Sequence, residues 1–227
     1  MPEPRHAVVS GASSGIGAAI AARLIDAGWQ VTGLDRAAPG APVPGLVVRQ
    51  VDLSDAAATR AALVGLAPVQ TLVHAAGMLR VGTLGALEPA DGMAMWAVHV
   101  QAATVLADAL APGMAEGGRI VLIGSRTASG AAGRGQYAAS KAALVGLARS
   151  WAAELAPRGI TVNVVAPAAT DTPMLRDPAR GAVSPRLPPI GRFVRPEEVA
   201  ALVAFLISPE AASITGQQIV ICGGSSL

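Results

Sequence analysis

The 227-residue chain is poor in charged residues and in aromatic rings. Charged residues make up 14% of it and aromatic residues 3%, and 17 lysines and arginines face 15 acidic residues. Because the positive residues are scattered and form no dense basic stripe, we expect no nucleic-acid partner. The hydrophobic share of 52% excludes a disordered chain, and it favours a surface that is partly covered in an oligomer.

The chain also lacks the signals of export and of membrane insertion. Its single cysteine, Cys222, excludes an internal disulfide and a multi-cysteine metal site, so we predict no metal. The first residues have neither the basic nor the apolar region of a signal peptide, and there is no uninterrupted run of about 18 apolar residues. We therefore expect a cytoplasmic protein with no membrane partner.

Besides cysteine, three residue types occur once each: tyrosine, at Tyr137, lysine, at Lys141, and asparagine, at Asn163. In a chain that otherwise uses arginine, a lone lysine four residues after a lone tyrosine indicates that both side chains are needed there. On a helix, the two would project from the same face. The alternative is an exposed pair with no role.

Predicted strands and helices alternate along the chain. The strands are expected at 6–10, 30–35, 46–51, 71–74, 119–124, 160–166 and 218–222, and the helices at 18–27, 55–66, 89–114, 136–156 and 196–207. Continuous apolar strands such as 161–165 are typical of a parallel sheet that is covered on both faces. We predict a single doubly wound α/β domain of the Rossmann type over residues 1–227. It would have about seven parallel strands and a proline-rich substrate loop at 167–195.

A glycine-rich turn, Ser10–Gly17, separates the first predicted strand from the first helix. Glycines let the backbone approach a pyrophosphate, and the helix N-terminus favours its negative charge. Asp35 ends the second strand 18 positions after Gly17, where a carboxylate accepts from the ribose hydroxyls of NAD and repels the 2′-phosphate of NADP. Arg36 can accommodate that phosphate, so NAD is the preferred cofactor and NADP the alternative.

With this turn, the Tyr137 and Lys141 pair, and the segment 214–217, the chain resembles the short-chain dehydrogenase/reductase family over nearly its whole length. The resemblance implies an NAD(P)-dependent oxidoreductase with Ser125, Tyr137 and Lys141 as catalytic residues. The residues it implies for cofactor binding are Gly11, Ser14, Gly15, Ile16, Gly17, Asp35, Asp52, Leu53, Ala76, Gly77, Tyr137, Lys141, Pro167, Thr170 and Thr172. Two of these also have simpler explanations, because Asp52 could cap a helix starting near Asp55 and Thr172 could belong to an ordinary turn.

The chain departs from the family pattern at three places. His74 and Ala75 stand where the family often has two asparagines, so the hydrogen bonds of those side chains must come from elsewhere or be absent. His99 stands where the family usually has a helix asparagine that holds a water for proton relay. Histidine can relay a proton itself, so His99 is either a catalytic replacement or a satisfied core residue. Ala168 replaces a glycine that commonly follows the proline at Pro167.

The chemistry assigns a role to each catalytic candidate. Hydride transfer leaves one proton to move at the substrate oxygen, and Tyr137 is the candidate acid/base. The Lys141 ammonium would stabilise the phenolate and bind the nicotinamide ribose. Ser125 would orient the substrate oxygen, and Ser129, further into the following loop, is less well placed to do so.

The substrate is expected to be a small hydrophobic or cyclic secondary alcohol, or its ketone. Met78, Leu79, Met174, Leu175 and Phe193 would line an apolar pocket. Arg80 is the one obvious anion partner, so a carboxylate substrate gains weight if Arg80 faces that pocket.

Three further expectations concern the whole molecule. Segments 75–82 and 219–227 show a weaker resemblance to bacterial 2,3-dihydro-2,3-dihydroxybenzoate dehydrogenases, although the loop after Thr172 is shorter here. A non-catalytic dinucleotide-binding sensor or regulatory subunit is the alternative function. The family resemblance implies a homotetramer or homodimer built from the helices at 89–114 and 136–156.

Overall fold

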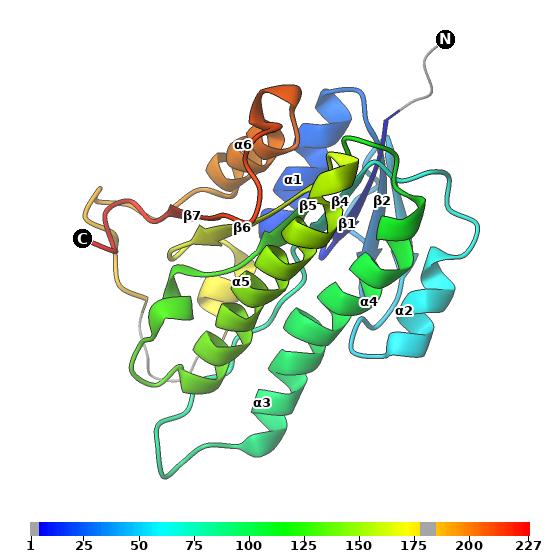
Figure 1. The fold of residues 1–227 in the computed structure, drawn as a ribbon. Helices are drawn as coiled ribbons and strands as arrows, with labels where there is room; N and C mark the ends of the chain where they lie inside the picture. The colour runs from blue at the N-terminus through cyan, green and yellow to red at the C-terminus, as the bar shows by residue number, and fades with distance from the viewer. Residues whose placement is uncertain (1–4, 178–184) are drawn as a thin grey trace.

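A computed structural model describes residues 5–177 and 185–227. Its seven strands form one parallel sheet in the order β3-β2-β1-β4-β5-β6-β7 (Figure 1). The strands are β1 (His6–Ser10), β2 (Gln30–Asp35), β3 (Leu46–Gln50), β4 (Thr71–His74), β5 (Arg119–Ile123), β6 (Thr161–Pro167) and β7 (Gln218–Ile221). Because the strand order reverses between β1 and β4, a crevice for a ligand is expected at their carboxyl ends.

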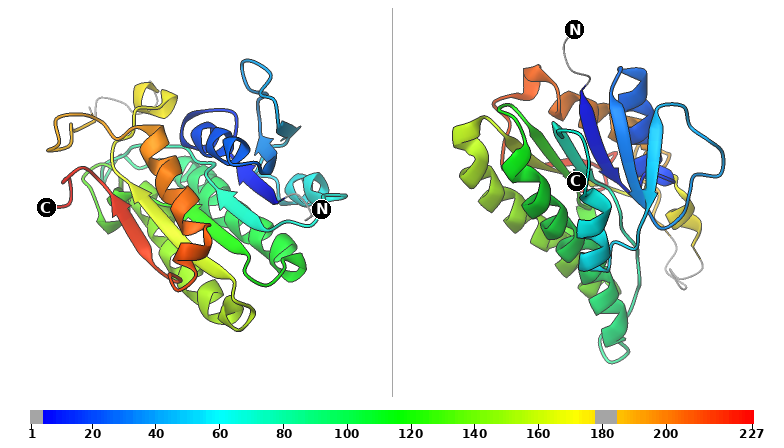
Figure 2. Two further views of the ribbon diagram at one scale, coloured as in Figure 1. Left: turned by 90° about the horizontal axis from the view of Figure 1, so that it is seen from above. Right: turned by 90° about the vertical axis from the view of Figure 1, so that its right-hand side faces the viewer.

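Helices cover both faces of the sheet, which confirms the doubly wound fold (Figure 2). The helices are α1 (Gly15–Asp26), α2 (Ala56–Leu63), α3 (Pro89–Trp96), α4 (Ala102–Leu110), α5 (Gly135–Leu155) and α6 (Pro196–Leu206). Val8 of β1 packs in one core with residues of α2, α4 and α5, and its neighbour Val9 packs in a second core with residues of α1 and α6. Successive residues of a strand point to opposite faces, so a central strand has to be apolar throughout.

The helix expected at 89–114 is not one continuous α-helix. Between α3 and α4 the chain forms one turn of π-helix, Ala97–Gln101, with the buried His99 at its centre. The segment Pro89–Gly113 is long and apolar enough to cross a membrane by length and composition alone. Half of its apolar window is buried inside the protein, as in the core helix of a globular domain.

The other helix boundaries differ from the sequence prediction by a few residues, as is usual for helix ends. The largest difference is at α1, which begins at Gly15, inside the glycine turn, and not at residue 18. The expected domain 1–227 and its loop 167–195 include residues 1–4 and 178–184, which lie outside the described residues.

The single asparagine attaches the last strand to the sheet. The Asn163 side chain is fully buried in β6, where its Nδ2 donates to the Ile214 carbonyl at 2.7 Å and its Oδ1 accepts from the Gln217 backbone N–H at 3.1 Å. The backbone N–H of Val162 donates to the Thr215 hydroxyl at 3.1 Å. The Asn163 amide thus adds two hydrogen bonds to the backbone bonds that join Gly216 and Gln217 to β6.

Replacing Asn163 with alanine should lower the free energy of unfolding by about 1–3 kcal/mol, because two part-buried hydrogen bonds are lost at about 0.5–1.5 kcal/mol each. Chemical denaturation of the purified variant measures this. Gln218→Ala, at an exposed position of β7, is the control and should stay within about 0.5 kcal/mol of the parent. Equal stability of the two variants would contradict the assigned role of Asn163.

Candidate active site

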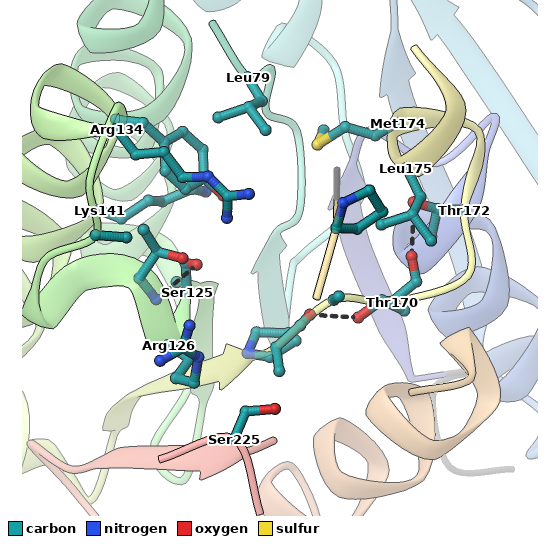
Figure 3. Close-up of a pocket in the computed structure, with 18 of the residues that line it drawn as sticks. Leu79, Ser125, Arg126, Arg134, Lys141, Thr170, Thr172, Met174, Leu175 and Ser225 are labelled. Atoms are coloured by element: carbon teal, nitrogen blue, oxygen red, sulfur yellow. Dashed lines mark hydrogen bonds between the residues drawn. The ribbon is translucent and has the colours of Figure 1, made fainter. Parts of the chain in front are cut away.

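Two adjoining cavities open at the carboxyl ends of the central strands. The smaller, of about 250 Å³, lies over the glycine turn, and the larger, of about 620 Å³, lies beside α5 (Figure 3). Eleven of the expected cofactor residues line the smaller cavity: Gly11, Ser14, Gly15, Ile16, Gly17, Asp35, Asp52, Leu53, Ala76, Gly77 and Thr172. The remaining site residues line the larger, as Thr172 also does: His99, Ser125, Tyr137, Lys141, Pro167 and Thr170. The fold thus brings all the expected site residues together, and their roles stay predictions.

The glycine turn leaves room for a ligand because its backbone packs without side chains. A Cβ atom on Gly11, which has φ +70°, would lie 2.9 Å from the backbone of Ala76, and a Cβ on Gly17 would collide with the Gly11 carbonyl. No side chain caps α1, and no acidic residue lies in its first turn. Its free N–H groups and its dipole therefore suit a pyrophosphate, and the residues fit a dinucleotide.

Asp35 is held at the edge of the smaller cavity by backbone donors. Its Oδ2 accepts from the Ser13 N–H at 3.0 Å, and its Oδ1 accepts from the Ala37 N–H at 3.3 Å. The Arg36 side chain lines the same cavity. The two charges that the sequence predicted to decide between NAD and NADP are thus both present at one site.

Asp52 does not cap the following helix, so that interpretation is wrong. Asp55 is the N-cap of α2, and its carboxylate accepts from the N–H groups of Ala57 and Ala58. The Asp52 Oδ1 accepts instead from the hydroxyl and the N–H of Ser54, and these hydrogen bonds lower the pKa of Asp52. The turn holds the Asp52 carboxylate where it lines the cofactor cavity.

His74 supplies the hydrogen bonds that the family's asparagines would otherwise provide. Its Nε2 donates to the Val98 carbonyl at 3.1 Å, and its Nδ1 accepts from the Ser10 hydroxyl at 2.8 Å. The Ser10 oxygen in turn accepts from the N–H groups of Ala75 and Ala76, both at 3.1 Å. Burial, aided by the charge of Lys141, lowers the pKa of His74 to about 3, so the ring is neutral at neutral pH.

His99 joins the loop after β4 to the start of α5. Its Nε2 accepts from the Met78 N–H at 3.0 Å, and its Nδ1 pairs at 2.9 Å with the Ser140 hydroxyl, which donates to the Tyr137 carbonyl. The imidazole also meets the Tyr137 ring edge-on, with centroids 5.6 Å apart. Burial lowers the pKa of His99 well below its ordinary value. With both nitrogens bonded inside the protein, the geometry favours a positioning role over a proton relay.

Lys141 lies one helical turn after Tyr137 on α5 and is almost fully buried. Its Nζ donates to the Ile123 carbonyl at 2.8 Å, and it would lie 3.5 Å from a Cβ built on Gly77. Burial lowers the pKa of Lys141 to about 7. An anion placed beside this amine would favour its charged form, and the charged form would favour the anion.

Ser125 is better placed than Ser129 to contact a substrate. The buried Ser125 oxygen accepts from the Thr127 N–H at 3.1 Å, which leaves its hydroxyl proton for another acceptor. Figure 3 shows it on the same wall of the cavity as Lys141. The exposed Ser129 hydroxyl donates to the Arg126 carbonyl and does not line the cavity.

One expectation about the substrate pocket is wrong, and the condition set for Arg80 is not met. Phe193 does not line the larger cavity, although Met78, Leu79, Met174 and Leu175 do. Arg80 turns away as well: its Nε lies 3.6 Å from Asp91 Oδ1, and its Nη1 donates to the Leu79 carbonyl. Both residues lie on loops, whose side-chain directions no periodicity predicts.

The arginines that do line the cavity are Arg126, Arg134 and Arg186. Sequence reasoning missed all three. A usable signal was present for two of them, because Arg126 directly follows Ser125 and Arg134 precedes Tyr137 by three residues. A residue that follows a site residue at the end of a strand, or that lies one turn before it at the start of a helix, is close enough to line the same cavity.

Comparison with known proteins assigns the family. A family model described as Enoyl-(Acyl carrier protein) reductase matches residues 11–226. A solved short chain dehydrogenase from Burkholderia cenocepacia, in complex with NADP, superposes with a TM-score of 0.86 at 37% identity, covering 98% of each chain. This chain belongs to the short-chain dehydrogenase/reductase family. It is an oxidoreductase that acts on CH–OH donors with NAD(P).

Characterised relatives of this short-chain dehydrogenase/reductase act on different substrates. The 3-oxoacyl-[acyl-carrier-protein] reductase of Vibrio cholerae is 35% identical, over 98% of this chain and 97% of its own. The 2,3-dihydro-2,3-dihydroxybenzoate dehydrogenase of Escherichia coli is 37% identical over 96% of each. The similarity extends over the whole enzyme in both cases, so it establishes the reaction type without selecting a substrate.

The buried, neutral His74 should make the dehydrogenase/reductase less stable in acid. An exposed histidine in the unfolded chain binds a proton below pH about 6.5, whereas His74 in the native state stays neutral down to about pH 3. Unfolding therefore takes up a proton in this range, and the free energy of unfolding falls as the pH is lowered from 6.5 to 3, by at most about 5 kcal/mol.

The variant His74→Asn should have a shallower dependence of the free energy of unfolding on pH between about 6.5 and 4, as measured by urea denaturation at several pH values. His99 keeps its own contribution in both proteins. Parallel curves for the parent and the variant would show that His74 does not titrate on unfolding.

Proposed function

We propose that the chain interconverts a hydrophobic or cyclic secondary alcohol and its ketone, with Tyr137 as the acid/base. The observation that carries this proposal is that Ser125, Tyr137 and Lys141 line one cavity, continuous with the cavity over the glycine turn. Ile16, Gly77 and Thr172 line both cavities, so a dinucleotide over the turn would reach the catalytic residues. When bound, NAD(P) accepts or supplies the hydride.

The protein's own residues handle the proton at the substrate oxygen. Tyr137 gives the proton in reduction and takes it in oxidation, while the Ser125 hydroxyl orients the same oxygen. A phenol has an ordinary pKa of about 10, so work near neutrality needs roughly 4 kcal/mol of extra phenolate stabilisation. Lys141 supplies it in its charged form, and His99 with Ser140 fixes the helical turn that carries Tyr137.

The non-catalytic sensor is not supported as an alternative. Its case rested on His74 and His99, which replace residues usual in the family. Both histidines are fully hydrogen-bonded and preserve the local structure, and the catalytic serine, tyrosine and lysine all line the cavity. A binding module would have no need for a serine and a tyrosine in this arrangement.

Tyr137→Phe should lower kcat by at least about 10²-fold, since the phenol is the proton donor, while the affinity for NADH changes little. Steady-state turnover of a panel of cyclic and aryl secondary alcohols and ketones, with NADH binding by fluorescence, measures both quantities. Ser125→Ala should also lose turnover, and its matched control Ser129→Ala should keep it. An active Tyr137→Phe protein would refute the assignment.

We propose NAD as the preferred cofactor. The Asp35 carboxylate, held by two backbone N–H groups, accepts from ribose hydroxyls and repels a 2′-phosphate. The Burkholderia relative was solved with NADP, and Arg36 offers that phosphate a partner, so NADP is the alternative.

Titration with both reduced cofactors should show tighter binding of NADH. Asp35→Ser removes the repulsion and should shift the ratio of the two affinities toward NADPH by about tenfold, equivalent to about 1.4 kcal/mol. Asp26→Ser, which removes an exposed carboxylate at the end of α1, should leave the ratio unchanged. A parent enzyme that prefers NADPH would identify Arg36 as the stronger selector.

We also propose a cytoplasmic homotetramer or homodimer, in which residues 1–227 act as one cofactor-binding unit and the loop 167–195 shapes the substrate pocket. The long helices α3 to α5 would form the contact between subunits. Met93 and Trp96 support this interface, because on α3 they are 74% and 49% exposed. Burying such apolar surface against a second copy is favourable.

A further inference from the structure

The larger cavity has an excess of positive charge. The described residues that line it include Arg126, Arg134, Lys141 and Arg186. No aspartate and no glutamate is among the described lining residues. The chain as a whole is nearly balanced, with 17 basic and 15 acidic residues. The imbalance is therefore a local property of the cavity, and a cavity of one sign attracts a ligand of the other.

Two of these arginines lack partners, unlike many arginines elsewhere in the chain. Arg60 pairs with Asp108 at 2.9 Å, and Arg192 makes a two-fold pair with Glu198. Arg126 and Arg134 make no side-chain hydrogen bond or ion pair within the described part of the chain. The Nε of Arg134 is moreover buried from solvent and without an acceptor. The terminal nitrogens of Arg134, which face the cavity, are therefore the donors that a ligand can use.

The backbone holds Arg134 in a fixed place near the catalytic residues. Its N–H donates to the Ala131 carbonyl at 3.1 Å, its own carbonyl accepts from Ala138 at 2.7 Å, and the residue forms a bridge with Gly82. It precedes Tyr137 by three residues, which is about one helical turn. Figure 3 shows its guanidinium extending into the cavity from the wall that also carries Ser125. A group bound there would lie on the same substrate whose oxygen contacts Tyr137.

The opposite wall carries the apolar side chains of Met174 and Leu175 next to Thr170 and Thr172, whose hydroxyls donate to backbone carbonyls. Met174 and Leu175 face Arg134 across the cavity, and Leu79 lies between these two sides (Figure 3). A substrate that fits has a hydrophobic skeleton along this wall and one charged group on the arginine side.

We infer that the substrate of this enzyme is a secondary alcohol or ketone that carries an oxyanion, a carboxylate or a phosphate, bound by the two terminal nitrogens of Arg134. A guanidinium presents two parallel donors that match two oxygens of either group. Arg126, on the same wall, adds the second positive charge. The inference rests on the proposed function, which gives the position of the reacting oxygen, and it adds the class of substrate. Arg80 points away from the cavity and cannot bind the anion there.

Binding can be tested without turnover. We would titrate the purified full chain, with and without saturating NADH, with cyclohexanecarboxylate, cyclohexyl phosphate and neutral cyclohexanecarboxamide by calorimetry. At least one anion should bind about tenfold or more tightly than the amide. A preference for one of the two anions identifies the oxyanion.

Arg134→Gln should weaken binding of the preferred anion about 10- to 100-fold and change binding of the amide less than about threefold, because only the charge-assisted pair is lost. Arg134→Lys, which keeps the charge but loses the two parallel donors, should give an intermediate affinity, and it serves as the second variant if Arg134→Gln does not fold. Arg60→Gln, which removes a surface arginine away from the cavity, is the matched control and should behave as the parent.

Equal binding of the amide and both anions, or an anion preference that survives Arg134→Gln, would overturn the inference. The two proposals fail in different ways. Arg134-dependent anion binding without turnover of any hydroxy acid, phosphate ester or neutral alcohol would sustain the anion site and reject the proposed reaction. Turnover of neutral alcohols at the same rate as their anionic counterparts, in the parent and in Arg134→Gln, would sustain the reaction and reject the anion site.

Discussion

The hydrogen bond between the Ser10 hydroxyl and His74 holds together the two strands at which the sheet reverses its order. The same serine oxygen accepts from the loop after β4, and the other nitrogen of His74 holds the π-turn. The loop is thereby drawn so close to the glycine turn that Gly11 cannot carry a side chain. Together with the backbone ladder between β1 and β4, this contact fixes the spacing of three backbone segments beside the cofactor cavity.

A second constraint is that the turn of α5 that carries Tyr137 is surrounded by buried polar side chains. His99, Ser140 and Lys141 are all buried, and they fix the turn of α5 that carries Tyr137. Burial favours the neutral form of each basic group, which lowers the pKa of Lys141 to about 7. A lysine so close to its midpoint responds strongly to a nearby negative charge.

The two sides of the crevice are built from different kinds of structure. The strands and the glycine turn fix the cofactor side of the crevice, whereas loops and the 3₁₀ turns 126–129 and 173–176 form the substrate side. Arg126 and Met174 lie on those turns. Exchanging such residues changes the charge and shape of the pocket without disturbing the sheet.

The sequence by itself determined the α/β fold class with its parallel sheet, the glycine turn, and the Tyr137 and Lys141 pair. Each depends on local periodicity or on a fixed spacing along one helix. It did not determine the direction of side chains on loops, so Arg80 and Phe193 were expected in the pocket and Arg134 was not. It did not determine which groups the His99 ring contacts, since those groups, Met78 and Ser140, are distant in sequence. Only the tertiary structure decided these points, because hydrogen-bond partners and cavity walls come from segments that meet on folding.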